Sequence, residues 1–251
     1  MNSIALGMVV FICLFGAALT GSWARSRLPD THLNTNSTDV IKLATAIVGT
    51  LSAIALGLLI ASSKNTFDNA ESELTASAAN LVLLDRVMAH YGPELDAARQ
   101  LVRKLIEERL ESDSSSGNGG NDISVFAADI EPIQDHLRSL SPTTFAQRSL
   151  QARALEVSSK IAEDDWLLAE TEKERLPGPF IVMMVFWLSV LFATFGLLAP
   201  RNGTVAAILC VCALSVSGAV YLVMEMSHPF AGLIQIPDAP LRQALEYIGK
   251  Q

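Results

Sequence analysis

The sequence has 251 residues, of which 50% are apolar and 18% charged, and its formal net charge is −8. This balance is usual for a membrane protein and unusual for a soluble domain. The negative charge and the lack of a basic face exclude nucleic acid as an expected partner, because phosphate binding needs clustered Lys and Arg. The three cysteines all lie in apolar segments, which excludes a disulfide framework.

Four long windows contain at most one charged residue each and are predicted to span the lipid bilayer. They cover residues 1–24, 40–63, 177–200 and 203–226. About 20 helical residues cross roughly 30 Å of hydrocarbon, whereas a barrel strand needs only about 10 residues of alternating polarity. These windows are longer than barrel strands and apolar on every side. The predicted fold class is therefore all-α, an integral membrane protein with four transmembrane helices and a helical extramembrane bundle inserted between the second and third.

The first two spans are joined by a polar loop over residues 25–39, with Asp39 as the expected N-cap of the second span. Beyond that span, the chain contains no Gly or Pro from Lys64 until Gly92. Apolar residues at 67, 74, 81 and 88 repeat every seven positions there, which predicts that the second span continues as one helix with a face for partner helices. A single chain is not expected to cover this face fully, so the face favours a homo-oligomer.

The rest of the inserted domain, predicted over residues 64–176, is also helical by periodicity. Pro93 suits the first turn of a helix that ends near Glu111, and residues 112–121 read as a flexible linker by composition. A short helix is predicted over 126–140. Ser141 and Pro142 are the expected N-cap and first residue of a long helix that reaches the third span.

The tail, residues 227–251, is expected to contain a short amphipathic helix over 241–248 that lies along the membrane surface or against the helical domain. Four spans place both termini and the helical domain on one side of the membrane. The side is unresolved, because Arg25 and Arg27 favour cytoplasmic short loops, while the basic residues Lys64, Lys173, Arg175 and Arg242 favour the opposite orientation.

The closing segment carries a sequence motif, in which the distinctive residues are Glu225, His228, Pro229, Phe230 and Gly232. This segment resembles the closing motif of the bacterial bestrophin-like membrane proteins, a family without an assigned activity. The segment Tyr91-Gly92-Pro93-Glu94 and the Leu176-Pro177 entry to the third span match the same family. The family pattern commonly has an acidic and then a basic residue where this sequence has Ser227 and His228. A role that depends on those two charges therefore does not carry over from the family to this chain.

The resemblance implies a multi-pass protein of the bacterial inner membrane and a channel-like homo-oligomer that conducts a small inorganic ion. Bestrophins are oligomeric anion channels whose pore is lined by the second span, and likeness of fold does not fix function. The alternative is a non-conducting, membrane-anchored scaffold or sensor whose helical domain recruits a partner. An enzyme is not expected.

The second span offers two interpretations. Lys42, Thr45, Gly49 and Ser52 recur at spacings of three and four, so they share a helical face that would line a water-filled path. Small residues on the same helix would instead serve helix packing, with Lys42 reaching the membrane surface. Those packing candidates are Ala46, Ala53 and Gly57, together with Gly49.

No cofactor or metal site is predicted. The acidic groups at 68–73 and 163–165 lack the loop of alternating ligands and the turning Gly of a calcium site, and the four histidines have no zinc spacing. Glu225, at the end of the fourth span, has two interpretations. Its carboxylate would form a pH-sensitive ion pair with the imidazole of His228, or it would simply reach water.

Overall fold

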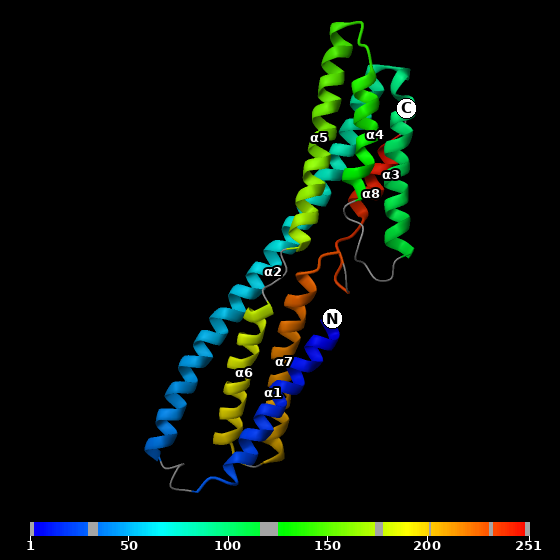
Figure 1. Cartoon of the computed structure of the whole chain (residues 1–251). Coiled ribbons are helices and arrows are strands. Elements are labelled where there is room, and N and C mark those ends of the chain that lie inside the picture. The colour runs from blue at the N-terminus through cyan, green and yellow to red at the C-terminus, as the bar shows by residue number, and fades with distance from the viewer. Residues whose placement is uncertain are drawn as a thin grey trace. The chain divides into compact units, whose positions relative to one another are not determined.

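The computed structural model describes residues 3–29, 35–115, 125–173, 178–200, 202–230 and 233–248, without the side chains of 112–115, 125–129 and 167–173. The chain forms two compact units (Figure 1). We call Met1–Asn65 with Leu176–Ser227 the membrane unit, and Thr66–Arg175 with His228–Gln251 the extramembrane unit. Every regular element in the described ranges is a helix, which confirms the predicted all-α class.

Within the described residues, four helices are long and apolar enough to cross a membrane. They are α1 (Ser3–Arg25), the first part of α2 (Thr35–Tyr91), α6 (Gly178–Leu198) and α7 (Gly203–Met226). The prediction of Asp39 as an N-cap was wrong, because α2 is already helical at Thr35. Neither Gly nor Pro interrupts residues 35–39, and Asp39 instead pairs with Lys42, one turn further on, at 3.2 Å.

Helix α1 lies against both α6 and α7, and its crossing with α6 is very close. A Cβ atom added at Gly21 would lie 1.9 Å from the carbonyl oxygen of Ala193, and one added at Gly196 would lie 1.9 Å from that of Ala18. Only a hydrogen fits at either position. The core beside this crossing is aliphatic and aromatic, and it includes Leu14, Met184 and Phe192.

The extramembrane unit is built around the second part of α2. Its other elements are the 3-10 turn η2 (Pro93–Leu95), α3 (Asp96–Ser115), α4 (Val125–Ser139), α5 (Phe145–Lys173) and α8 (Ala239–Tyr247). The predicted stripe, with an apolar residue at every seventh position, forms part of the core. Its members Leu74, Leu81 and Met88 are all buried. Residues of α3, α4, α5 and α8 pack in the same core. The expectation that one chain does not fully cover this stripe was wrong for Leu74, Leu81 and Met88, whereas Phe67 is only partly buried.

The turn between α2 and α3 depends on Gly92, whose φ of 139° is a conformation that L side chains rarely adopt. An ion pair crosses this turn. Arg99 Nε lies 2.8 Å from Asp85 Oδ1, and Arg99 Nη2 lies 3.3 Å from Asp85 Oδ2, with the carboxylate buried. This two-pronged contact fixes α3 against α2.

Two helix ends differ from their predictions. Helix α5 begins at Phe145 rather than at Pro142, because Thr144 and Gln147 form a capping box. The Gln147 amide donates to the Thr144 hydroxyl at 3.1 Å, and the Gln147 side-chain oxygen accepts from the Thr144 amide at 3.3 Å. Helix α3 continues to Ser115, so the first residues of the predicted linker 112–121 are helical, and its remainder lies outside the described residues.

The tail packs against the extramembrane core, which decides between its two predicted positions. Leu241 and Ala244 of α8 are buried there with Ile236 and Ile248. An amphipathic helix suits a membrane surface or a protein core equally well by sequence, and these contacts show the latter.

Candidate functional site

Three of the four residues predicted to line a path face the interior of the membrane unit. Ser52 is 2% exposed, and its hydroxyl donates to the Val48 carbonyl at 2.8 Å. The Thr45 hydroxyl donates to the Ile41 carbonyl at 2.7 Å. A Cβ added at Gly49 would contact Leu191 of α6 at 3.7 Å. Both hydroxyls are thus satisfied by their own helix, and Gly49 contacts α6.

Lys42, the fourth of these residues, lies outside this contact. Its side chain is 62% exposed, and its ammonium group lies 3.2 Å from Asp39 Oδ1. Both partners are largely exposed, so solvent screens the pair and its contribution to stability is small. The carboxylate nevertheless offsets the positive charge that Lys42 brings to this end of α2.

The residues predicted to serve helix packing are exposed. Ala46, Ala53 and Gly57 are exposed, and among the described residues nothing beyond the neighbouring backbone of α2 lies within 4 Å of a Cβ added at Gly57. Thr50 and Ala61 continue the same exposed face. We call these five residues the small-residue stripe: Ala46, Thr50, Ala53, Gly57 and Ala61.

A lysine stands near each end of the small-residue stripe, because Lys42 precedes it and Lys64 follows it. Together, the stripe and the two lysines recur at spacings of three and four, which places them along one side of α2. Thr50, Ala61 and Lys64 were missed by the sequence reasoning, although the same spacing would have found them.

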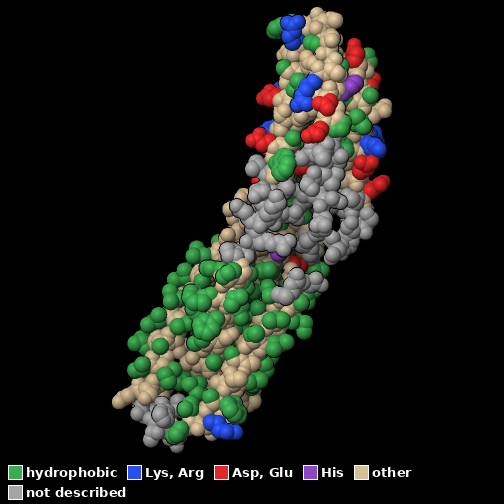
Figure 2. Space-filling model, viewed as in Figure 1, with side chains coloured by type: hydrophobic (Ala, Val, Ile, Leu, Met, Phe, Trp, Pro, Cys, Tyr) green, Lys and Arg blue, Asp and Glu red, His purple; other side chains and the backbone are tan. Residues whose placement is uncertain are grey.

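Large apolar side chains flank the stripe. Five of them are between 52% and 66% exposed, namely Leu43, Ile47, Leu51, Ile54 and Leu58. Figure 2 shows the same character on the visible face of the membrane unit, where apolar side chains predominate, while charged side chains gather on the extramembrane unit. In a membrane-spanning helix, such a surface is covered by lipid or by another protein helix.

The closing motif begins at a buried carboxylate. Glu225 is 2% exposed and accepts a hydrogen bond of 3.1 Å from the Tyr221 hydroxyl, one turn earlier on α7. The interpretation that Glu225 simply reaches water was therefore wrong. Close by in sequence, the hydroxyls of Ser227 and Ser63 lie 3.1 Å apart, which ties the end of α7 to α2.

The remaining motif residues belong to the extramembrane unit. Pro229 is buried, and its carbonyl accepts a hydrogen bond of 3.0 Å from the Ile236 amide, which closes the loop before α8. Phe230 packs against the core of that unit. Gly232 lies outside the described residues. The pairing of Glu225 with His228 stays a prediction.

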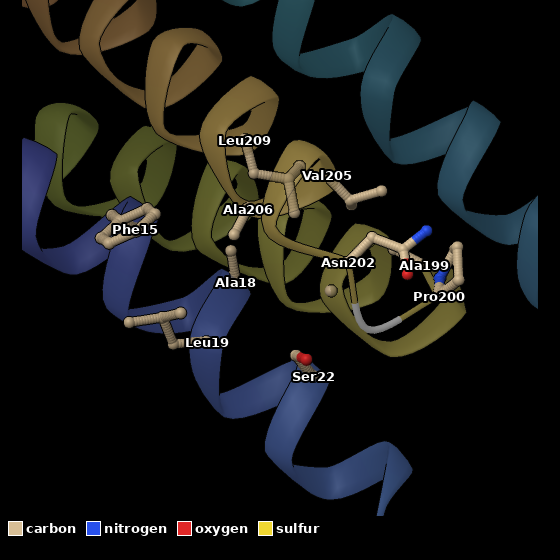
Figure 3. A pocket seen from close by; sticks show the side chains of 11 residues that line it. Phe15, Ala18, Leu19, Ser22, Ala199, Pro200, Asn202, Val205, Ala206 and Leu209 are labelled. Carbon is tan, nitrogen blue, oxygen red and sulfur yellow. The ribbon is translucent and has the colours of Figure 1, made fainter.

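A small cavity of about 50 Å³ lies where α1 meets the α6–α7 hairpin (Figure 3). Phe15, Ala18 and Leu19 line it from α1, and Ala206 and Leu209 from α7. Its volume exceeds the roughly 10–15 Å³ that one water needs, but a bound water also needs two to four polar partners. The lining is almost entirely apolar, so the cavity has the character of a packing gap.

Arg25 of α1 forms hydrogen bonds with the C-terminal end of α6. One guanidinium nitrogen, Nη1, donates to the carbonyls of Leu197 at 3.3 Å and Leu198 at 2.9 Å. A cation at the carbonyl end of a helix interacts favourably with the helix dipole. Arg25 therefore has a structural partner here.

Across the described ranges, no three His, Cys, Asp or Glu side chains lie close enough together to hold a metal ion.

Comparison with known proteins gives two findings. The sequence matches the family described as Bestrophin-like domain over residues 12–241. The fold is similar to the crystal structure of a mutant bacterial bestrophin homologue from Klebsiella pneumoniae, with a TM-score of 0.63, 13% sequence identity and 99% of each chain covered. No curated protein matches the sequence. At this identity, the structural likeness shows the fold alone.

Proposed function

Because this chain belongs to the family of proteins with a bestrophin-like domain, we propose that it is the subunit of a homo-oligomeric, channel-like protein of the bacterial inner membrane that conducts small anions. The observation that carries the proposal is the exposed small-residue stripe of α2 with a lysine near each end. The anion specificity rests on those lysines and on the likeness to bestrophins.

The stripe supports a conducting path for a steric reason. Ala, Gly and Thr side chains are short, so several copies of α2 around a common axis would leave room between them, which rows of Leu or Ile would fill. Lys42 and Lys64 would raise the local concentration of anions at the two mouths. We prefer this path to the predicted one along Thr45, Gly49 and Ser52, because Ser52 is buried and Gly49 packs against Leu191 of α6 within the same chain.

A single α2 cannot enclose a path, so the proposal requires several subunits. The exposed apolar residues beside the stripe, such as Ile47 and Ile54, support this requirement, since they offer a surface for neighbouring copies. The apolar stripe of the extramembrane unit gives no such support at Leu74, Leu81 and Met88, because the same chain buries them.

The test is ion flux into liposomes containing the purified protein, comparing chloride, potassium and calcium. Chloride flux is expected to exceed potassium flux. Gly57→Leu, which fills the stripe, is expected to reduce chloride flux at least tenfold, while Gly16→Leu, on α1 with equal room for a Cβ, leaves the flux unchanged.

A pair of charge variants tests the mouth at Lys42. Lys42→Ala is expected to lower chloride flux, and Asp39→Asn to raise it, because the latter removes the carboxylate that offsets the lysine charge. Flux that is absent for every ion at all pH values and voltages would refute conduction. That result would favour the scaffold or sensor, in which the large apolar side chains beside the stripe seal the axis.

A further inference from the structure

The end of α1 carries a cation that stacks on an aromatic ring. The guanidinium carbon of Arg27 lies 4.9 Å from the centroid of the Trp23 ring, which is within the range of a cation–π contact. Both side chains are exposed, Trp23 by 57%. The Arg27 amide donates to the Ala24 carbonyl at 2.9 Å, and the Ser26 hydroxyl donates to the Trp23 carbonyl at 2.6 Å. These bonds fix Arg27 one turn beyond Trp23.

The stacked pair lies at the depth of the phospholipid headgroups. With α1 along the membrane normal, the helix rises about 29 Å from Ile4 to Trp23, which matches the roughly 30 Å of hydrocarbon. Trp23 therefore lies at the boundary between hydrocarbon and water, where tryptophan is enriched. Arg27 follows about 6 Å further out, and each headgroup layer is about 5–8 Å thick. Its guanidinium group is thus at the level of the lipid phosphates.

Arg27 differs from two other cations described at this end of the membrane unit. Arg25 donates to two carbonyls of α6, and Lys42 pairs with Asp39. Among the described residues, no carboxylate pairs with Arg27. Stacking uses one face of the guanidinium group and leaves its N–H edge for an anion. This planar edge suits two phosphate oxygens at once.

We propose that Arg27 and Trp23 bind the phosphate group of a membrane phospholipid. The guanidinium N–H groups donate to the phosphate oxygens, and the indole ring lies beside the first methylene groups of the lipid. Charge complementarity favours this ligand over a second copy of the chain. A second copy would have to bring a carboxylate to this depth, and the described carboxylate nearest to Arg27 in sequence, Asp39, already offsets Lys42.

The experiment is native mass spectrometry of the full chain in detergent, titrated with phosphatidylglycerol. Each bound lipid adds its own mass, so the dissociation constant of the tightest site can be measured. Arg27→Gln is expected to raise this constant at least fivefold. Arg27→Lys is expected to raise it at least twofold, because lysine keeps the charge and loses the planar fork. Equal dissociation constants for Arg27→Gln and the wild type would overturn the proposal.

Two more variants separate the stacked pair from charge in general. Trp23→Leu keeps an apolar side chain but removes the ring under the guanidinium group, and it is expected to raise the dissociation constant at least twofold. Arg103→Gln is the matched control, since Arg103 is an exposed arginine of the extramembrane unit that pairs with Glu107. It should change the constant by less than twofold. An equal loss in Arg103→Gln and Arg27→Gln would show that net charge alone matters, and would overturn the site.

Two further titrations identify the ligand. Dioleoylglycerol, which lacks the phosphate, is expected to bind equally to the wild type and to Arg27→Gln. Inorganic phosphate at the concentration of the lipid is expected to leave phosphatidylglycerol bound. Displacement of the lipid by inorganic phosphate would assign the site to the free anion and overturn the proposal.

The same spectra test a second copy as the occupant, because they report the number of chains in each particle. Fewer chains per particle in Arg27→Gln, with unchanged lipid binding, would assign Arg27 to a contact between copies and would also overturn the proposal. Lipid binding is measured without ion flux, so failure of conduction and failure of this site are distinguishable.

Discussion

Alanine at Gly21 or Gly196 should force α1 and α6 apart. At both positions, a Cβ would lie 1.9 Å from a backbone carbonyl oxygen, and contacts below 3.0 Å essentially never occur. The helices must therefore separate locally by about 1 Å, since a backbone oxygen cannot rotate away as a side chain can. A gap of 0.5–1 Å already forfeits roughly a quarter to a half of each contact's attraction.

We expect each substitution to cost at least about 1–3 kcal/mol of unfolding free energy, the usual range for overpacking. The measurement is unfolding of the purified protein in mixed detergent with increasing sodium dodecyl sulfate. The double variant should cost less than the sum of the single ones, because one separation of the helices relieves both contacts.

Gly16→Ala is the matched control, with the same change on the same helix and open space at the Cβ. It should be neutral or slightly stabilising, because alanine has the higher helix propensity. If Gly21→Ala and Gly16→Ala unfold at the same detergent fraction, the close crossing does not contribute as argued.

Three further substitutions test other contacts. Arg25→Ala should cost about 1–2 kcal/mol, because it removes the cation from the carbonyl end of α6, with Arg25→Lys restoring part of the loss in the same detergent assay. Asp85→Asn should cost about 1.5–3 kcal/mol by weakening the hydrogen bonds to Arg99, measured by thermal unfolding. Burial, and then the negative charge of Asp164, raise the pKa of Glu73 above 4.5, and one of its carboxylate oxygens is buried with no hydrogen-bond partner. The stabilising contribution of the protonated form is therefore fully present below pH 4.5 and is lost as pH rises through the raised pKa. Glutamine stays uncharged at every pH, so Glu73→Gln should unfold at a higher temperature than the wild type at neutral pH.

A control or a contradicting outcome can be stated for each of the three substitutions. Loss of the same stability in Arg25→Lys as in Arg25→Ala would show that the positive charge contributes nothing. Asp135→Asn, in an exposed pair with Arg138, is the control for Asp85→Asn and should change stability by less than about 0.5 kcal/mol. Parallel stability curves for the wild type and Glu73→Gln between pH 4.5 and neutrality would contradict the raised pKa.

The sequence predicted the positions of the helices better than it predicted which side of each helix packs against the others. Four apolar windows and the repeat through Leu74, Leu81 and Met88 are local patterns, and both correspond to helices of the structure. The two candidate faces of α2 could not be distinguished in this way. Adjacent residues such as Thr45 and Ala46 differ by only about 100° around a helix, and the choice depends on Leu191, far away in sequence.

The close crossing of α1 and α6 was not predicted either. In the sequence, Gly16 and Gly21 are both glycines in an apolar helix. Only the position of α6 makes them different, because a carbonyl of α6 lies beside Gly21 while the space at Gly16 is open. The burial of Glu225 depends in the same way on tertiary packing around the end of α7.

The contacts of α1 also constrain the order in which the protein assembles during synthesis. Arg25 and the carbonyl of Leu197 are separated by 172 residues. At about 5–20 residues per second, a ribosome needs roughly 9–34 s to reach α6 after α1 has entered the membrane. During that interval α1 has no α6 to pack against, so the flat surface around Gly21 is filled by lipid, which α6 must displace on arrival. A chain truncated before α6 would leave α1 in that unfinished state.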